Sequence, residues 1–212
     1  MDRLGRRRVK AMNGISGLCL EIELSRFLAL SCISRYIIAA KLAAALRRGD
    51  GAIISIKAAG VARYLDTDDI ELKKSKTTSF FGIPIPPLTI SDNPANSMRE
   101  SAIHDVFAQE FETRAGVPYY HFYPGLVSTN AVNNNEVGFL VSYLFKIASF
   151  IGITPSQWAP VPVSVVLNRP SYTTVSQKGT EAPVKSAIRE PELRNKVMAF
   201  FKDTTGVELG RS

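Results

Sequence analysis

Apolar residues recur every three or four positions over the first quarter of the chain, in the range Leu18–Arg48. This spacing places them on one face of an amphipathic helix, and two arginines directly before Gly49 are typical of a helix end. The pattern therefore predicts a helix over about Glu21–Arg47. A turn at "GDG" follows, and the β-branched run "AIISIKA", Ala52–Ala58, predicts a short buried strand.

A second helix and a second strand come later in the chain. Ala95–Gly116 has apolar side chains on one face and a glycine at its end, which predicts another amphipathic helix. The residues after it, "VPYYHFY", predict a second buried strand. A strand, a crossover helix and a strand form a βαβ unit, so Ile53–Ile56 and Tyr119–Phe122 are expected to be neighbouring or near-neighbouring parallel strands. The predicted fold class is α/β.

The remaining segments give weaker patterns. Residues 60–95 contain a charged run and "FFGIPIPPLTISDNP", whose four prolines exclude a regular helix. An apolar stretch over Glu136–Gly152 predicts a helix, and Thr154 followed by Pro155 is typical of a helix start. Lys178–Gly179 marks a turn after a strand, and residues 189–206 predict a C-terminal amphipathic helix.

The composition is that of an ordinary globular protein. The chain has 212 residues, 45% hydrophobic and 21% charged, which allows one domain with a hydrophobic core. The net charge is +7, and the first fourteen residues hold five Lys or Arg against one Asp. Residues 1–16 are therefore expected to be a disordered basic tail, with a contact to nucleic acid or lipid, or a transit peptide, as alternatives. Residues 17–212 form the predicted domain.

The cysteines and histidines limit metal and redox chemistry. Cys19 and Cys32 stand thirteen positions apart in apolar surroundings without a CxxC motif. They are expected to be buried thiols in a reducing, cytoplasmic compartment. His104 and His121 are the only histidines, too few for a typical zinc site, so no metal site is expected.

Membrane and nucleic-acid binding are not favoured either. The longest apolar run, Val137–Ile153, carries Lys146 in its middle and is short for a membrane span. It predicts a buried or surface-dipping helix, and membrane contact is not expected. No basic patch is interleaved with aromatic residues, so no nucleic-acid partner is expected.

Two groups of ionisable residues are candidates for binding or proton transfer. The acidic cluster consists of Asp66, Asp68, Asp69 and Glu71. It could bind a divalent cation, but its spacing favours a solvated face. The second group, Glu100, His104 and Asp105, lies on one predicted helix, with the first two residues four positions apart. These residues could form an acid/base pair, and a hydrogen bond on the helix surface is the favoured interpretation.

The stretch "HFYPGLVSTN", His121–Asn130, places a Pro-Gly turn directly after the second predicted strand. Together with residues 24–60, the charged run "LDTDDIELKK" and residues 189–206, it carries a family resemblance. From about Gly17 to Gly206 the chain resembles the short-chain dehydrogenase/reductase family, in the divergent form common among fungal sequences. In that family the loop after the sixth strand has the pattern P-G-x-x-x-T.

The resemblance implies a Rossmann-like parallel sheet, incomplete at its N-terminal side, and NADP or NAD as cofactor. Pro124 and Gly125 would turn the backbone under the nicotinamide ring, and main-chain groups near Val127 would bond its carboxamide. Thr129 would offer a hydroxyl that both donates and accepts. Tyr123, next to the loop, is a candidate for lining a pocket.

The chain departs from the family pattern in its cofactor cradle and its proton relay. No Gly-rich turn of the dinucleotide-binding kind occurs, and the family's first strands have no counterpart. The family's Ser, Tyr and Lys correspond by chain order to Ala58, Asn93 and Ser97, and no Y-x-x-x-K exists. The helical Asn of many members would fall at Ser31 or Cys32. The catalytic residues are therefore unassigned.

Two functions follow from these features. The family resemblance implies an NAD(P)-dependent oxidoreductase that acts on a small apolar carbonyl or alcohol. Because the cofactor cradle and the proton relay are missing, this chain is expected to lack the usual redox activity. The alternative is a non-redox protein on the same scaffold: a pseudoenzyme, a subunit, or a cyclase or isomerase that uses an apolar pocket. A third interpretation is that the chain is a truncated gene product. An open sheet edge favours a homo-oligomer. The predicted helices Glu21–Arg47 and Ala95–Ala115 also correspond to the two helices that commonly build dimer interfaces in the family.

Overall fold

A three-stranded parallel sheet lies at the centre of the protein. The computed structural model describes residues 7–12, 19–24, 28–62, 65–71, 78–80, 83–85, 94–125, 127 and 152–210. The sheet has the order β3-β6-β7, with β3 at Ile53–Ile56, β6 at Tyr119–Phe122 and β7 at Thr174–Val175. Both neighbouring pairs are parallel. The predicted α/β class and the parallel pairing of the first two strands are confirmed.

The N-terminal part differs from the predicted long helix. β1 (Arg7–Met12), within the predicted basic tail, pairs antiparallel with β2 (Cys19–Leu24). The predicted helix start at Glu21 is therefore wrong. The β2 sequence "CLEIEL" alternates apolar and acidic residues with the period of two that suits a strand. A π-helix, η1 (Ala29–Ile33), then leads into α2 (Ser34–Arg48).

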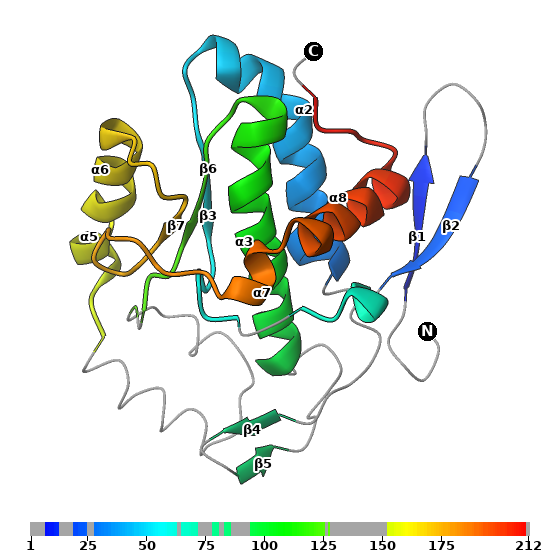
Figure 1. Cartoon of the computed structure of the whole chain (residues 1–212), viewed down its shortest axis with the longest axis horizontal. Helices are drawn as coiled ribbons and strands as arrows, with labels where there is room; N and C mark the ends of the chain where they lie inside the picture. The colour runs from blue at the N-terminus through cyan, green and yellow to red at the C-terminus, as the bar shows by residue number, and fades with distance from the viewer. Residues whose placement is uncertain are drawn as a thin grey trace.

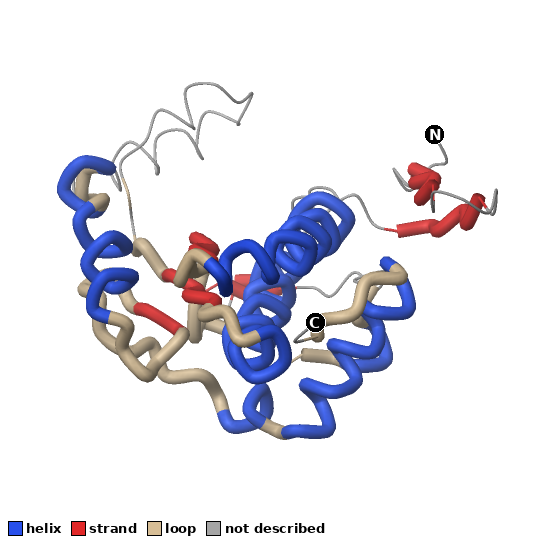
Figure 2. Tube along the Cα trace, turned by 90° about the horizontal axis from the view of Figure 1, so that it is seen from above, coloured by secondary structure: helices blue, strands red, loops and turns tan. Residues whose placement is uncertain are grey.

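Helices cover the sheet on two sides (Figures 1 and 2). α3 (Pro94–Ala115) crosses over between β3 and β6, as predicted. It lies on one side of the sheet with α2, α7 (Ser186–Arg189) and α8 (Pro191–Thr205). The short helices α5 (Pro155–Trp158) and α6 (Pro160–Asn168) lie on the other side. α8 confirms the predicted C-terminal helix.

Local sequence signals account for several helix ends. The Thr154 side chain accepts from the Gln157 N–H, and the Gln157 side chain accepts from the Thr154 N–H. This capping box confirms the predicted helix start. α8 ends at Gly206, whose φ of 66° is left-handed and favours glycine. The helix predicted over Glu136–Gly152 lies outside the described residues except for its last position.

The described residues between β3 and α3 form short elements. η2 (Thr67–Asp69) is a single 3₁₀ turn, and β4 (Thr78–Phe80) pairs antiparallel with β5 (Ile83–Ile85). The prolines of this region exclude a long helix, as the sequence predicts.

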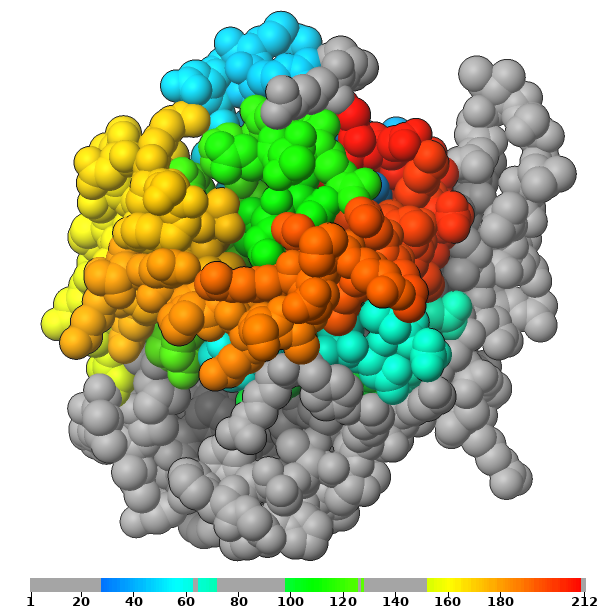
Figure 3. Space-filling model, in the orientation of Figure 1, coloured from blue at the N-terminus to red at the C-terminus, as the bar shows by residue number. Residues whose placement is uncertain are grey.

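Aromatic rings from four elements form the main core. The ring centroid of Phe201 in α8 lies 4.9 Å from that of Phe107 in α3 and 5.2 Å from that of Tyr36 in α2. Figure 3 shows the orange and red C-terminal segments lying across the green helix α3. A smaller cluster around Trp158 and Phe122 covers the opposite face of β6. All four residues of β6 are buried, as expected for a sheet covered on both faces.

Candidate functional site

The predicted Pro-Gly loop leaves the carboxyl end of β6. Gly125 has a φ of +68°, and a Cβ at this position would lie 2.5 Å from the side-chain Cδ of Gln177. Glycine is therefore needed both for the left-handed turn and for close contact with the segment after β7. Pro124 is partly buried, and Val127 forms a parallel bridge with Ile153. Thr129, the fourth residue predicted to contact nicotinamide, lies outside the described residues.

A buried polar cluster lies directly beneath this edge of the sheet, between the strands and α3. Ser55 of β3 and His121 of β6 are opposite each other in register. Ser55 hydrogen-bonds to His104 of α3 and His121 hydrogen-bonds to Asp105 of α3, while Glu100 of the same helix pairs with Lys57, the residue after β3. The three α3 residues are at most 1% exposed. The interpretation of the α3 group as a surface hydrogen bond is therefore wrong, because these residues lie on the side of α3 that packs against β3, β6 and η1.

His121 and Asp105 form one half of the cluster. His121 Nδ1 lies 2.8 Å from Asp105 Oδ1, and both side chains are fully buried. The two carboxylate oxygens of Asp105 also accept from the backbone N–H of Gly60, at 3.2 and 3.3 Å. Donation from Nδ1 to the carboxylate leaves Nε2 as an acceptor. This buried Nε2 has no hydrogen-bond partner in the part of the chain that the structure describes.

His104 forms the other half with Tyr119. His104 Nε2 lies 2.9 Å from the backbone carbonyl of Ser31, so it donates there. Nδ1 is then an acceptor, 2.7 Å from the Tyr119 hydroxyl and 3.3 Å from Ser55 Oγ. Burial first, and then the neighbouring His121, lower the pKa of His104 well below its usual value. Burial raises the pKa of Tyr119, so this hydroxyl stays protonated and is a poor acid.

Lys57 connects the cluster to the surface. Its Nζ lies 2.5 Å from Glu100 Oε2, and its side chain is 16% exposed against 1% for Glu100. Burial raises the pKa of Glu100, while the charge of Lys57 opposes that rise. The second oxygen, Oε1, has no partner among the described residues. The pair therefore places a buried carboxylate, whose pKa is raised, directly behind an amine that solvent reaches.

The structure describes two of the three positions that correspond to the family's catalytic residues, Ala58 and Ser97. Ala58 directly follows the Lys57 backbone at the end of β3, and Ser97 lies in the first turn of α3. Asn93 lies outside the described residues. Ser31 and Cys32 are in η1, where Cys32 is fully buried and burial raises its thiol pKa. In the helices that the structure describes, no tyrosine has a lysine four residues after it.

Two further sequence candidates have a structural role. In the acidic cluster, Asp69 is buried and pairs with Arg99, with 2.5 Å between Asp69 Oδ2 and the guanidinium Nη2. The solvated-face interpretation is therefore wrong for this residue. Asp66 caps the η2 turn by accepting from the Asp68 N–H at 3.1 Å. Tyr123, the candidate for lining a pocket beside the Pro-Gly loop, is 40% exposed at the end of β6.

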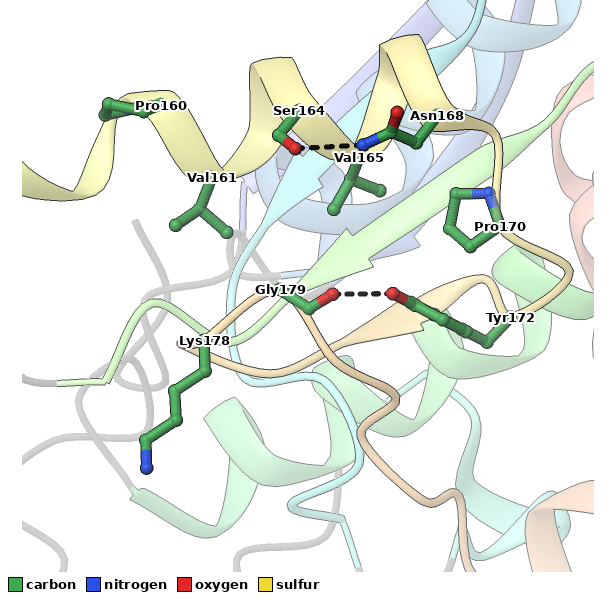
Figure 4. Close-up of a pocket in the computed structure, with 9 residues that line it drawn as sticks. All are labelled: Pro160, Val161, Ser164, Val165, Asn168, Pro170, Tyr172, Lys178 and Gly179. Carbon is green, nitrogen blue, oxygen red and sulfur yellow. Dashed lines mark hydrogen bonds between the residues drawn. The ribbon is translucent and has the colours of Figure 1, made fainter.

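A small cavity of about 280 Å³ lies between α6 and the turn after β7 (Figure 4). Val161 and Val165 line one side, and the Tyr172 hydroxyl donates to the Gly179 carbonyl at 2.6 Å on the other. Figure 4 shows the Lys178 side chain extending away from the helix. Its lining is mostly apolar, and Lys178 is the charged residue among the nine that line it.

Comparison with protein-family models, with curated proteins and with solved structures found no match to this chain.

Proposed function

We propose that the chain is a divergent protein on the short-chain dehydrogenase/reductase scaffold that binds a small, largely apolar molecule and does not transfer hydride. One observation carries this proposal: the carboxyl ends of three parallel strands meet at a single edge of the sheet. Lys57, the Pro124–Gly125 turn and Gln177 follow the three strands there. Open α/β sheets bind their ligands at this edge.

The described residues fit a dinucleotide cofactor poorly. The amide of Gln177 already packs against Gly125, in the position where the resemblance would place the nicotinamide ring. The sequence has no Gly-rich turn to hold a pyrophosphate. Pro124, Gly125, Val127 and Thr129 therefore remain the residues that the resemblance assigns to NADP or NAD, and no reaction step is assigned to the cofactor.

The polar cluster supports binding without redox chemistry. Lys57 is the member that solvent reaches, and the Glu100 carboxylate, whose pKa burial raises, lies directly behind it. Two buried polar atoms, His121 Nε2 and Glu100 Oε1, lack partners among the described residues. Leaving such atoms unpaired costs about 1–3 kcal/mol each. A polar group of a ligand that supplied these hydrogen bonds would recover part of that free energy, as in a cyclase or isomerase pocket.

The test is a titration of the full chain with NADPH and, separately, with octanal and cyclohexanone, followed by calorimetry and ligand-observed NMR. We expect at least one carbonyl compound to bind and NADPH to bind no tighter than about millimolar, because several charge-assisted hydrogen bonds are missing. Lys57→Met should weaken carbonyl binding. Micromolar NADPH affinity, with carbonyl reduction lost on Thr129→Val, would make the protein a dehydrogenase instead.

A further inference from the structure

β3 is an edge strand whose exposed side chains are apolar. In the described part of the chain, β6 is its only neighbour in the sheet. The backbone N–H of Ile53 donates to the carbonyl of Pro118, just before β6, at 2.8 Å. The backbone N–H of Lys57 donates to the carbonyl of Phe122 in β6 at 2.9 Å. Since amides alternate in direction along a strand, those of Ile54 and Ile56 point away from β6. Their side chains are 45% and 46% exposed, whereas edge strands are usually protected by charge, proline or a covering segment.

A groove of about 520 Å³ runs between this edge and α2. Ile38, Leu42 and Leu46 of α2 line one wall, and the first two are 58% and 50% exposed. Ile54 and Ile56 project from the opposite face of β3. A strand placed at this edge would therefore have apolar neighbours on both of its faces, as interior strands of parallel sheets do.

The charges at the groove distinguish between occupants. Arg35 lines one end, where its Nη1 donates to Ser55 Oγ at 3.3 Å, and its other N–H groups have no hydrogen bond to a described residue. Lys41 and Arg48 are exposed elsewhere on α2, which contains no acidic residue. A second copy docked through the same patch would bring like charges together. Ala29–Arg48 is long and apolar enough to cross a membrane, but lipid cannot pair the outward amides of β3.

We propose that the groove between α2 and β3 binds an extended apolar segment of another protein, which adds a strand to the sheet and places an acidic residue beside Arg35. Backbone hydrogen bonds to Ile54 and Ile56 supply affinity, and alternate side chains of the added strand contact α2 on one face. Arg35 selects for the acidic residue through a charge-assisted hydrogen bond. This surface is separate from the carboxyl edge assigned to the small molecule.

The test measures fluorescence anisotropy of a labelled peptide, Glu-Val-Ile-Val-Thr-Val-Asp-Glu, titrated with the full chain. We expect saturable binding that weakens by about tenfold on Arg35→Glu and on Leu42→Glu. Ile54→Pro removes one outward N–H and should weaken binding about fivefold. Lys178→Glu makes the same charge change as Arg35→Glu away from the groove, and should leave affinity unchanged. Circular dichroism of each variant separates lost binding from lost folding.

Three results would overturn the proposal. A peptide with lysines in place of its acidic residues could bind equally well, which would remove the role of Arg35. Light scattering could show a dimer that Ile54→Pro and Leu42→Glu convert to monomer, which would make a second copy the occupant and bear out the homo-oligomer expected from the sequence. Binding to phosphatidylserine vesicles, lost on Leu42→Glu while the peptide fails to bind, would assign the face to lipid.

Discussion

Removing Lys57 tests whether the polar cluster depends on its ion pair. Lys57→Met leaves the Glu100 carboxylate, 1% exposed, without the amine that lies 2.5 Å from it. Breaking a buried pair by removing one partner costs about 3–5 kcal/mol. Because Lys57 itself is 16% exposed, we expect the lower end, about 3 kcal/mol at pH 8. In a protein of this length such a loss lowers Tm by about 6–12 °C.

The pH dependence of this effect has a definite sign. Burial raises the pKa of Glu100 in the folded protein, and Lys57 limits the rise. An acid whose pKa is higher in the folded state takes up a proton on folding, so stability falls as pH rises from the unfolded pKa, about 4.3, through the folded pKa. Without Lys57 that interval extends to higher pH. The difference between Lys57→Met and the native protein should therefore be smallest near pH 5 and largest near pH 8.

Urea unfolding followed by the fluorescence of Trp158, the single tryptophan, provides the measurement. The double variant Lys57→Met, Glu100→Gln removes both charges and should recover most of the lost stability. Lys196→Met breaks the exposed pair with Glu192, at 3.0 Å, and should leave the urea midpoint nearly unchanged, because solvent screens this pair. The reasoning fails if Lys57→Met costs no more than Lys196→Met, or if its cost is the same at pH 5 and pH 8.

Two further substitutions probe the cluster and the loop. Tyr119→Phe removes the donor 2.7 Å from His104 Nδ1 and should lower the free energy of unfolding by about 1–2 kcal/mol. An unchanged urea midpoint would mean that Ser55 replaces the donor. Gly125→Ala introduces a Cβ at a φ of +68° and against Gln177, so a loss of about 1–3 kcal/mol is expected. Adding Gln177→Ala should restore the part of the lost stability that comes from the clash with Gln177, but not the part that comes from the left-handed backbone. Full recovery of stability would contradict the assigned backbone strain.

Local patterns predicted the elements whose signal is complete within a short segment. α3 has a continuous helical periodicity and a glycine after its end, β6 is a short run of large side chains, and Thr154 has its capping partner three residues later. β2 was mistaken for helix because its period-two alternation directly precedes the helical pattern that begins near Leu28. Sequence spacing also singled out Glu100 and His104 as a pair.

The setting of that pair could not be predicted. Its partners Lys57, Ser55 and Tyr119 come from two strands, and helices at the end of the chain cover α3. Burial of a polar residue depends on these distant segments. The sequence of a helix that carries charges on several faces therefore does not show that the helix is buried. The same holds for Asp69, whose partner Arg99 lies thirty residues away.

The position of Phe201 in the aromatic core has a consequence for how the chain folds during synthesis. Its ring packs against Tyr36 and Phe107, yet it belongs to the last helix. At about 5–20 residues per second, α8 leaves the ribosome roughly 8–30 s after α2. During that interval the apolar faces of α2 and α3 lack their cover. The aromatic core can therefore close only after α8 has been synthesised, and until then the nascent chain exposes aromatic side chains of α2 and α3.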